Sequence, residues 1–145
     1  MLTTLENILS YKNPSVVNRF QKEHPEKAEL AEQLFSDLMR FFWASNKHVA
    51  DRKIYPENNE LDFVFIMDEE MRYIDQMWHV FLLYTKDYME FCEQHFGEYL
   101  HHLPDVVPGL AKRQFNEQEN LSKFLSYIFD HLGEEVVRRR FKSSI

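Results

Sequence analysis

The sequence predicts an all-α protein, folded as one compact bundle of about six helices over residues 1–145. The chain has only three glycines and five prolines in 145 residues, too few for the turns of a multi-stranded sheet. Apolar residues recur at three- and four-residue intervals along several segments, which is the period of one helix face. A chain of this length buries a sufficient core as a single domain, and an aromatic content of 15% indicates a core built on rings.

Three helices are expected in the N-terminal half. The first covers residues 2–11, and Asn13 followed by Pro14 is typical of an N-cap and first helical position, so the second runs to about Glu23. A new helical pattern of apolar residues begins after Pro25. The third helix is the clearest amphipathic one, with an apolar stripe made of Ala31, Leu34, Phe35, Leu38, Met39 and Phe42.

The periodicity lapses from residue 48 to residue 67, where we predict an irregular loop. Pro56 and the polar residues that follow it are typical of a surface turn. The apolar run within 61–67 is short enough to leave strand and helix both open, and we favour extended or irregular chain there.

The central helices are expected to form a pair. Asp68 is a suitable N-cap for a helix that ends near Tyr84, and the hydroxyl of Thr85 is expected to cap a second helix from Lys86 to Phe96. Gly97 then suits a left-handed C-terminal position.

Two further helices are expected near the C-terminus. Asn116 to Glu119 resembles a capping box that begins a helix closed by Gly133. The last short helix ends in a basic run at 138–140 together with Lys142, which we interpret as a solvated helix end favoured by the helix dipole rather than as a docking tail.

Charge and composition exclude several classes of function. A net charge of −7 disfavours a nucleic-acid partner. No run of about eighteen apolar residues predicts membrane insertion, and no N-terminal signal pattern is present. Cytoplasm is therefore the default location, with signal-independent secretion left open. Cys92 is the only cysteine, which rules out an internal disulfide.

Chemistry-bearing residues concentrate between Asp75 and Pro104. Asp75 borders an apolar helix stripe and lies four residues before His79, so its carboxylate can orient the imidazole. A hydrogen-bonded structural pair is the alternative interpretation. We expect His79 and Cys92 to approach one common space, because both lie near the stripes of adjacent helices.

Further residues of the kinds that bind metal ions follow Asp75 and His79 in the sequence. Tyr88, Cys92 and His95 share one face of the next helix, and Cys92 and His95 are candidate ligands for zinc. Iron is the second candidate if Asp75 joins two histidines. His101 and His102 are adjacent on extended chain, so only one of them is expected to face the site.

The run from Asp75 to Pro104 resembles the bacterial and fungal members of the glycine-rich-domain-containing-protein-like family. The matching positions are Asp75, Trp78, His79, Leu83, Thr85, Tyr88, Phe91, Cys92, Phe96, Gly97, His101, His102 and Pro104. This resemblance implies no agreed biochemical activity. The chain lacks a glycine-rich tail, and Phe81 stands where plant relatives commonly have a further histidine.

The sequence leaves two functions open. One is a metal- or small-ligand-binding domain, with enzyme activity undecided, at Asp75, Trp78, His79, Tyr88, Cys92, His101 and His102. Its cofactor would be zinc or iron. The other is a non-catalytic adaptor for a protein partner, in which the same residues form a structural network and the binding function lies on a surface groove or on the 48–60 loop.

Overall fold

The computed structural model describes residues 3–66, 71–102 and 116–141. These residues form seven α-helices and no strand, which confirms the all-α class with one helix more than expected. The helices are α1 (Leu5–Leu9), α2 (Pro14–Glu23), α3 (Ala31–Ile54), α4 (Arg72–Leu83), α5 (Thr85–Phe96), α6 (Glu117–Leu132) and α7 (Glu134–Arg140). Two short 3-10 helices, η1 (Pro25–Leu30) and η2 (Asn59–Leu61), flank α3.

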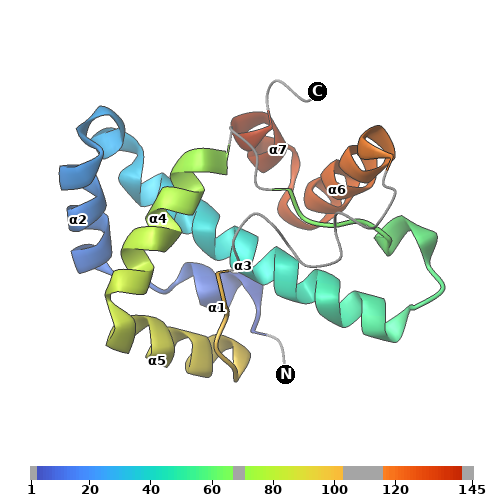
Figure 1. Cartoon of the computed structure of the whole chain (residues 1–145), viewed down its shortest axis with the longest axis horizontal. Coiled ribbons are helices and arrows are strands. Elements are labelled where there is room, and N and C mark those ends of the chain that lie inside the picture. The colour runs from blue at the N-terminus through green and yellow to red at the C-terminus, as the bar shows by residue number, and fades with distance from the viewer. Residues whose placement is uncertain (1–2, 67–70, 103–115, 142–145) are drawn as a thin grey trace.

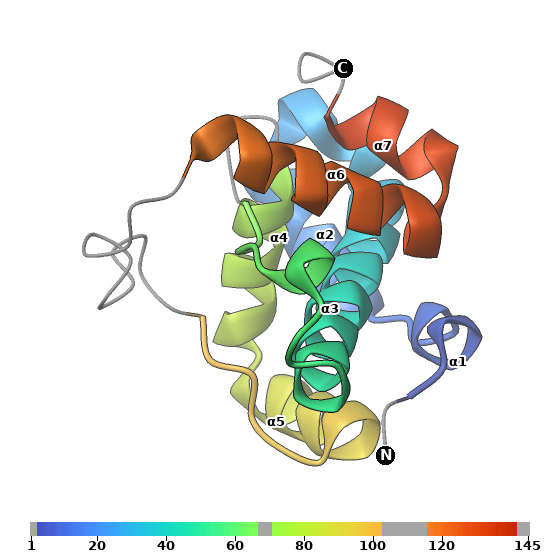
Figure 2. The ribbon, with the colours of Figure 1, turned by 90° about the vertical axis from the view of Figure 1, so that its right-hand side faces the viewer.

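Helix α3 runs through the centre of the bundle (Figure 1). Helices α1, α2 and α4 pack against it, α5 packs on α4, and α6 contacts both α3 and α7. Figure 2 shows α6 and α7 at the end of the molecule opposite α5. Phe42 of α3 packs on Trp78 of α4, and Asp51 of α3 accepts a hydrogen bond from Tyr127 of α6. Different residues of α3 therefore contact α4 and α6.

Local capping signals place most helix ends where the sequence predicts them. Asn13 accepts a hydrogen bond from the N–H of Val16 at the start of α2. Asn116 likewise accepts from the N–H of Glu119 to begin α6. Gly97 ends α5 with a φ of 72°, the left-handed conformation that favours glycine. These expectations are confirmed.

The predicted loop is shorter than expected because α3 continues to Ile54. His48 is buried inside this extension, its Nε2 lies 2.9 Å from the carbonyl oxygen of Leu61, and its ring stacks on Phe63 at 4.1 Å. Burial lowers the pKa of His48, so the ring packs there uncharged. Residues 62–66 have no regular secondary structure, as expected.

The boundaries of two other helices differ from the expectations. The first helix covers only Leu5–Leu9, with Thr4 as its N-cap. Thr85 is the first residue of α5 and does not cap it, because the helix already begins with a bond from the N–H of Tyr88 to the carbonyl of Tyr84. The expected cap Asp68 lies outside the described residues.

Aromatic side chains dominate the core in two groups. One group lies between α3, α4 and α5 and the start of the chain, and includes Tyr11, Phe35, Phe42, Phe81, Tyr88 and Phe91. The second joins α3 to α6 through the residues after η2, and includes His48, Phe63, Phe65, Phe124 and Tyr127. These contacts fix the relative positions of α3, α4 and α6.

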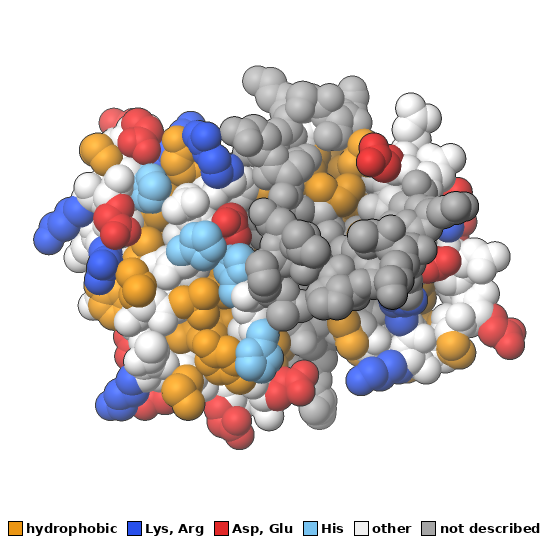
Figure 3. All heavy atoms as spheres, in the orientation of Figure 1, with side chains coloured by type: hydrophobic (Ala, Val, Ile, Leu, Met, Phe, Trp, Pro, Cys, Tyr) orange, Lys and Arg blue, Asp and Glu red, His pale blue; other side chains and the backbone are white. Residues whose placement is uncertain are grey.

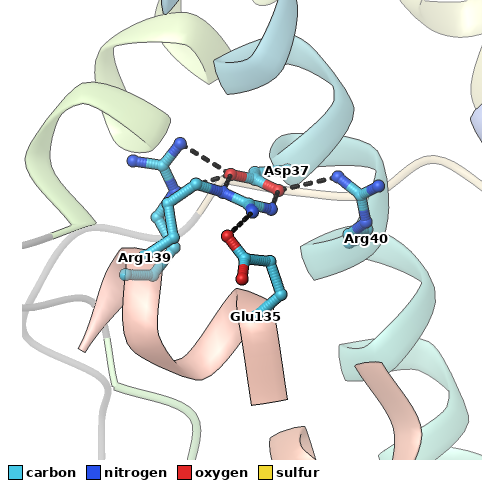
Figure 4. Close-up of polar contacts among 5 residues, drawn as sticks. Asp37, Arg40, Glu135 and Arg139 are labelled. Carbon is cyan, nitrogen blue, oxygen red and sulfur yellow. Dashed lines mark hydrogen bonds and ion pairs between the residues drawn. The ribbon is translucent and has the colours of Figure 1, made fainter. Parts of the chain in front are cut away.

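A buried carboxylate holds α7 against α3. The Asp37 side chain has no exposed surface and lies 2.8 Å from Arg40, 2.7 Å from Arg139 and 2.6 Å from Arg140 (Figure 4). Burial alone would raise the pKa of Asp37, but the hydrogen bonds and charges of Arg139 and Arg140 outweigh it and lower the pKa. The interpretation of 138–140 as a solvated end is therefore wrong for two of its three arginines, because a buried partner on α3 binds them.

No helix in the described ranges has both the length and the apolar character needed to cross a membrane.

Candidate metal site

Two imidazoles and one carboxylate meet on the surface of α4. Asp75 and His79 lie one turn apart on that helix, and His102 reaches them from the segment that follows α5. One ligand atom from each residue can be chosen so that all three lie within 4.8 Å of one another. Histidine side chains gather on this face, beside hydrophobic surface (Figure 3). We call Asp75, His79 and His102 the triad.

The carboxylate lies between the two rings. Asp75 Oδ1 is 2.6 Å from His102 Nε2, and Asp75 Oδ2 is 3.5 Å from His79 Nε2. The centroids of the two imidazole rings are 4.6 Å apart. Side-chain exposure is 23% for Asp75, 48% for His79 and 19% for His102, so the triad is open to solvent on one side.

A hydrogen-bond chain through the buried Tyr88 holds the segment that carries His102. Trp78 Nε1 donates to the hydroxyl of Tyr88 at 3.0 Å, and that hydroxyl donates to the carbonyl of Leu100 at 2.5 Å. Trp78 also packs its ring on His102, with centroids 4.1 Å apart. Burial raises the pKa of Tyr88, which keeps its hydroxyl protonated and able to donate. Trp78 and Tyr88 therefore position His102.

A family model described as UCP032817-like matches residues 4–131, which is most of the chain and includes the whole triad. The chain belongs to the UCP032817-like family. It is a family of domains of unknown function, and the match supports neither the glycine-rich name nor its motif. No curated protein and no solved structure matches the chain.

In this UCP032817-like domain, Cys92 does not join the triad. Its side chain is buried in the core. Burial raises the pKa of the thiol, which disfavours the thiolate that a metal requires. Cys92 does not belong to the group of ligand atoms that lie within 4.8 Å of one another, and its side chain is buried in the core while that of His79 is 48% exposed.

The other two candidate histidines also lie apart from the triad. His95 is buried against Phe91, and its Nδ1 is 3.3 Å from the hydroxyl of Thr3. Burial lowers the pKa of His95, which suits an uncharged core ring. His101 is exposed and packs on Tyr99 at 4.8 Å. Of the adjacent pair, His102 alone reaches Asp75.

Sequence analysis predicted neither the contact between Asp75 and His102, which is the shortest in the triad, nor the role of Leu100 in holding His102 in place. Asp75 lies nearer to His102 than to His79, although 27 positions separate Asp75 from His102. Leu100 holds that segment through its backbone, so no side-chain pattern could have indicated it. The only sequence signal was the pair of adjacent histidines after Gly97.

The hydroxyl of Tyr88 can be tested by substitution with phenylalanine. We expect Tyr88→Phe to lower the free energy of unfolding by about 1–3 kcal/mol, because Trp78 Nε1 and the Leu100 carbonyl lose a buried partner. If the triad binds zinc, Tyr88→Phe should also lower the zinc affinity by about tenfold to a hundredfold, the usual effect of removing a residue that orients a metal ligand.

Urea unfolding and a zinc titration measure the two effects of Tyr88→Phe. Tyr99→Phe is the matched control, because Tyr99 is 43% exposed and should change stability by no more than about 0.5 kcal/mol. Unchanged zinc affinity in Tyr88→Phe would show that the Leu100 anchor does not position His102.

Proposed function

We propose that this UCP032817-like domain binds a divalent transition-metal ion through Asp75, His79 and His102. The observation that carries the proposal is the convergence of three ligand atoms from two chain segments within 4.8 Å. The imidazoles come from both segments, so a bound ion would join α4 to the chain after α5.

The distances are close to those of a metal site. Zinc ligands at about 2.0–2.2 Å from the ion lie roughly 3.3–3.6 Å from each other in a tetrahedron. Asp75 Oδ2 and His79 Nε2 already have this separation, at 3.5 Å. Asp75 Oδ1 and His102 Nε2 lie 2.6 Å apart, at hydrogen-bond distance, so these two atoms would have to separate to admit an ion.

The ligand set favours zinc or ferrous iron. Two histidines and one carboxylate are found in catalytic zinc sites, where a fourth position stays open, and in non-haem iron sites. The partial exposure of all three triad side chains leaves room for water or a substrate at such a position. Hydrolytic or oxidative chemistry would depend on that open position.

Elemental analysis of protein purified without an affinity tag or chelator tests the proposal. We expect one equivalent of zinc or iron per chain. In metal-free protein, zinc at about 100 times its dissociation constant should raise the free energy of unfolding by about 2.7 kcal/mol. A metal-free preparation whose stability does not respond to zinc or ferrous iron would refute metal binding.

A structural role is the second candidate, and the hydrogen bond between Asp75 and His102 favours it. At 2.6 Å this bond alone can fasten the segment after α5 onto α4 without any ion. The domain would then act as an adaptor that binds a protein partner elsewhere on its surface. The zinc titration separates the two candidates, because the adaptor gains no stability from the metal.

A further inference from the structure

A segment that follows α3, residues 61–66, packs against both α3 and α6, and we call it the strap. Phe63 is only 1% exposed. The ring of Phe65 lies 5.5 Å from that of Phe41 on α3 and 5.1 Å from that of Phe124 on α6. The strap therefore ties the two helices together through buried aromatic contacts.

The side-chain amide of Asn120 holds the backbone of the strap on α6. Asn120 Oδ1 accepts a hydrogen bond from the N–H of Val64 at 2.8 Å, and Asn120 Nδ2 donates to the carbonyl of Val64 at 3.2 Å. The N–H of Val64 can exchange with solvent only when this contact breaks. Its exchange rate therefore reports release of the strap.

A buried imidazole on α3 contacts the strap directly. His48 is 5% exposed, its Nε2 lies 2.9 Å from the carbonyl oxygen of Leu61, and its ring stacks on Phe63 at 4.1 Å. Because a carbonyl only accepts, Nε2 carries the hydrogen of the neutral ring. A further proton would bind Nδ1 and place a positive charge among aromatic rings.

The surroundings of His48 favour the uncharged ring. Burial has the largest effect and lowers its pKa, while the hydrogen bond to Leu61 opposes this effect. The charge of Arg52 lowers the pKa further, and the charge of Asp51 raises it.

The charged groups on the neighbouring elements already have partners. Asp51 on α3 accepts from Tyr127 of α6 at 2.8 Å and lies 3.2 Å from Lys47. Asp62 on the strap is 65% exposed and lies 3.9 Å from Arg52. A protonated His48 would therefore have to draw a carboxylate away from its present partner.

We propose that the strap is a pH-sensitive latch, which is released from α3 and α6 when His48 takes up a proton. The closed latch buries the imidazolium among Phe63, Phe65 and Tyr127, whereas release returns it to water. Since burial lowers the pKa of His48, its contribution to closure is complete above the released-state value of about 6.5. The contribution is lost as the pH falls through the closed-state value.

Release of the strap also alters a cavity between α3, η2 and α6. The cavity has a volume of about 580 Å³, and Lys47, Asp51 and Tyr127 line it together with Leu61. Because Leu61 belongs to the strap, opening of the latch removes part of the cavity wall.

Hydrogen exchange of the Val64 amide, followed by NMR on the full chain at about pH 7.5 and about pH 5, tests the latch. After correction for the intrinsic exchange rate, the opening constant should rise by about tenfold at the lower pH. An opening constant that is equal at the two pH values overturns the proposal.

Substitutions identify the group that takes up the proton. His48→Gln keeps an N–H donor for Leu61 and His48→Phe keeps a ring, and in both the opening constant should change by no more than about twofold between the two pH values. His131→Gln is the matched control, because burial also lowers the pKa of His131 and its ring packs on Tyr127 at 4.3 Å. This control should keep the rise of about tenfold. The proposal is overturned if a folded His48 variant shows the full rise or if His131→Gln abolishes it.

Discussion

Asp37→Ala should lower the free energy of unfolding by about 3–5 kcal/mol. The substitution leaves Arg139 and Arg140, whose side chains are 16% and 12% exposed, without their buried counter-ion. Arg40 loses the same partner. Three neighbouring guanidinium groups then repel one another in a partly desolvated region, and α7 loses its main polar tie to α3.

Urea unfolding at neutral and acidic pH measures this effect. The pKa of Asp37 is lowered in the folded state, so its contribution is complete above the unfolded pKa of about 3.9 and is lost as the pH falls through the folded value. The difference between wild type and Asp37→Ala should therefore shrink in acid.

Asp62→Ala provides the control for Asp37→Ala. Asp62 is 65% exposed and lies 3.9 Å from Arg52, so its removal should cost no more than about 1 kcal/mol. Equal losses in the two variants would mean that the Asp37 cluster contributes no more than a surface ion pair.

His102→Ala should weaken zinc binding by about a hundredfold or more. The substitution removes one of three proposed ligands and the only one that α4 does not supply. Removing a residue that hydrogen-bonds to a metal ligand typically lowers metal affinity by about tenfold to a hundredfold. Removing the ligand itself should lower the affinity at least as much. Competition with a chromophoric zinc chelator measures the change.

The neighbouring histidine gives a closely matched control. His101 is exposed and packs on Tyr99, so His101→Ala should keep zinc affinity within about threefold of the wild type. Because the two variants differ by one position in the same segment, equal effects would argue that zinc binds elsewhere or without specificity.

Features that depend on near neighbours in the sequence were predictable. The caps at Asn13 and Asn116 each satisfy an N–H three residues later, and Gly97 ends its own helix. The end of α3 was not predictable in this way. His48 extends that helix by packing against Leu61 and Phe63, thirteen and fifteen residues further along the chain.

The same difference between local and long-range contacts applies to the candidate site. Asp75 and His79 lie one helical turn apart, so their pairing followed from spacing alone. The contact between Asp75 and His102 depends on how the segment after α5 returns to α4, which no local period encodes. Cys92 was placed at the site because it shares a helix face with Tyr88, but that face points into the core.

Helix α3 contacts both the triad region and the cavity that Lys47, Asp51 and Tyr127 line. The Phe42 ring packs on Trp78 beside His102, and Lys47, about 7.5 Å further along the helix axis, lines that cavity. Any free energy of coupling between a metal at the triad and a ligand in the cavity would be reciprocal, so each would alter the affinity of the other by the same factor.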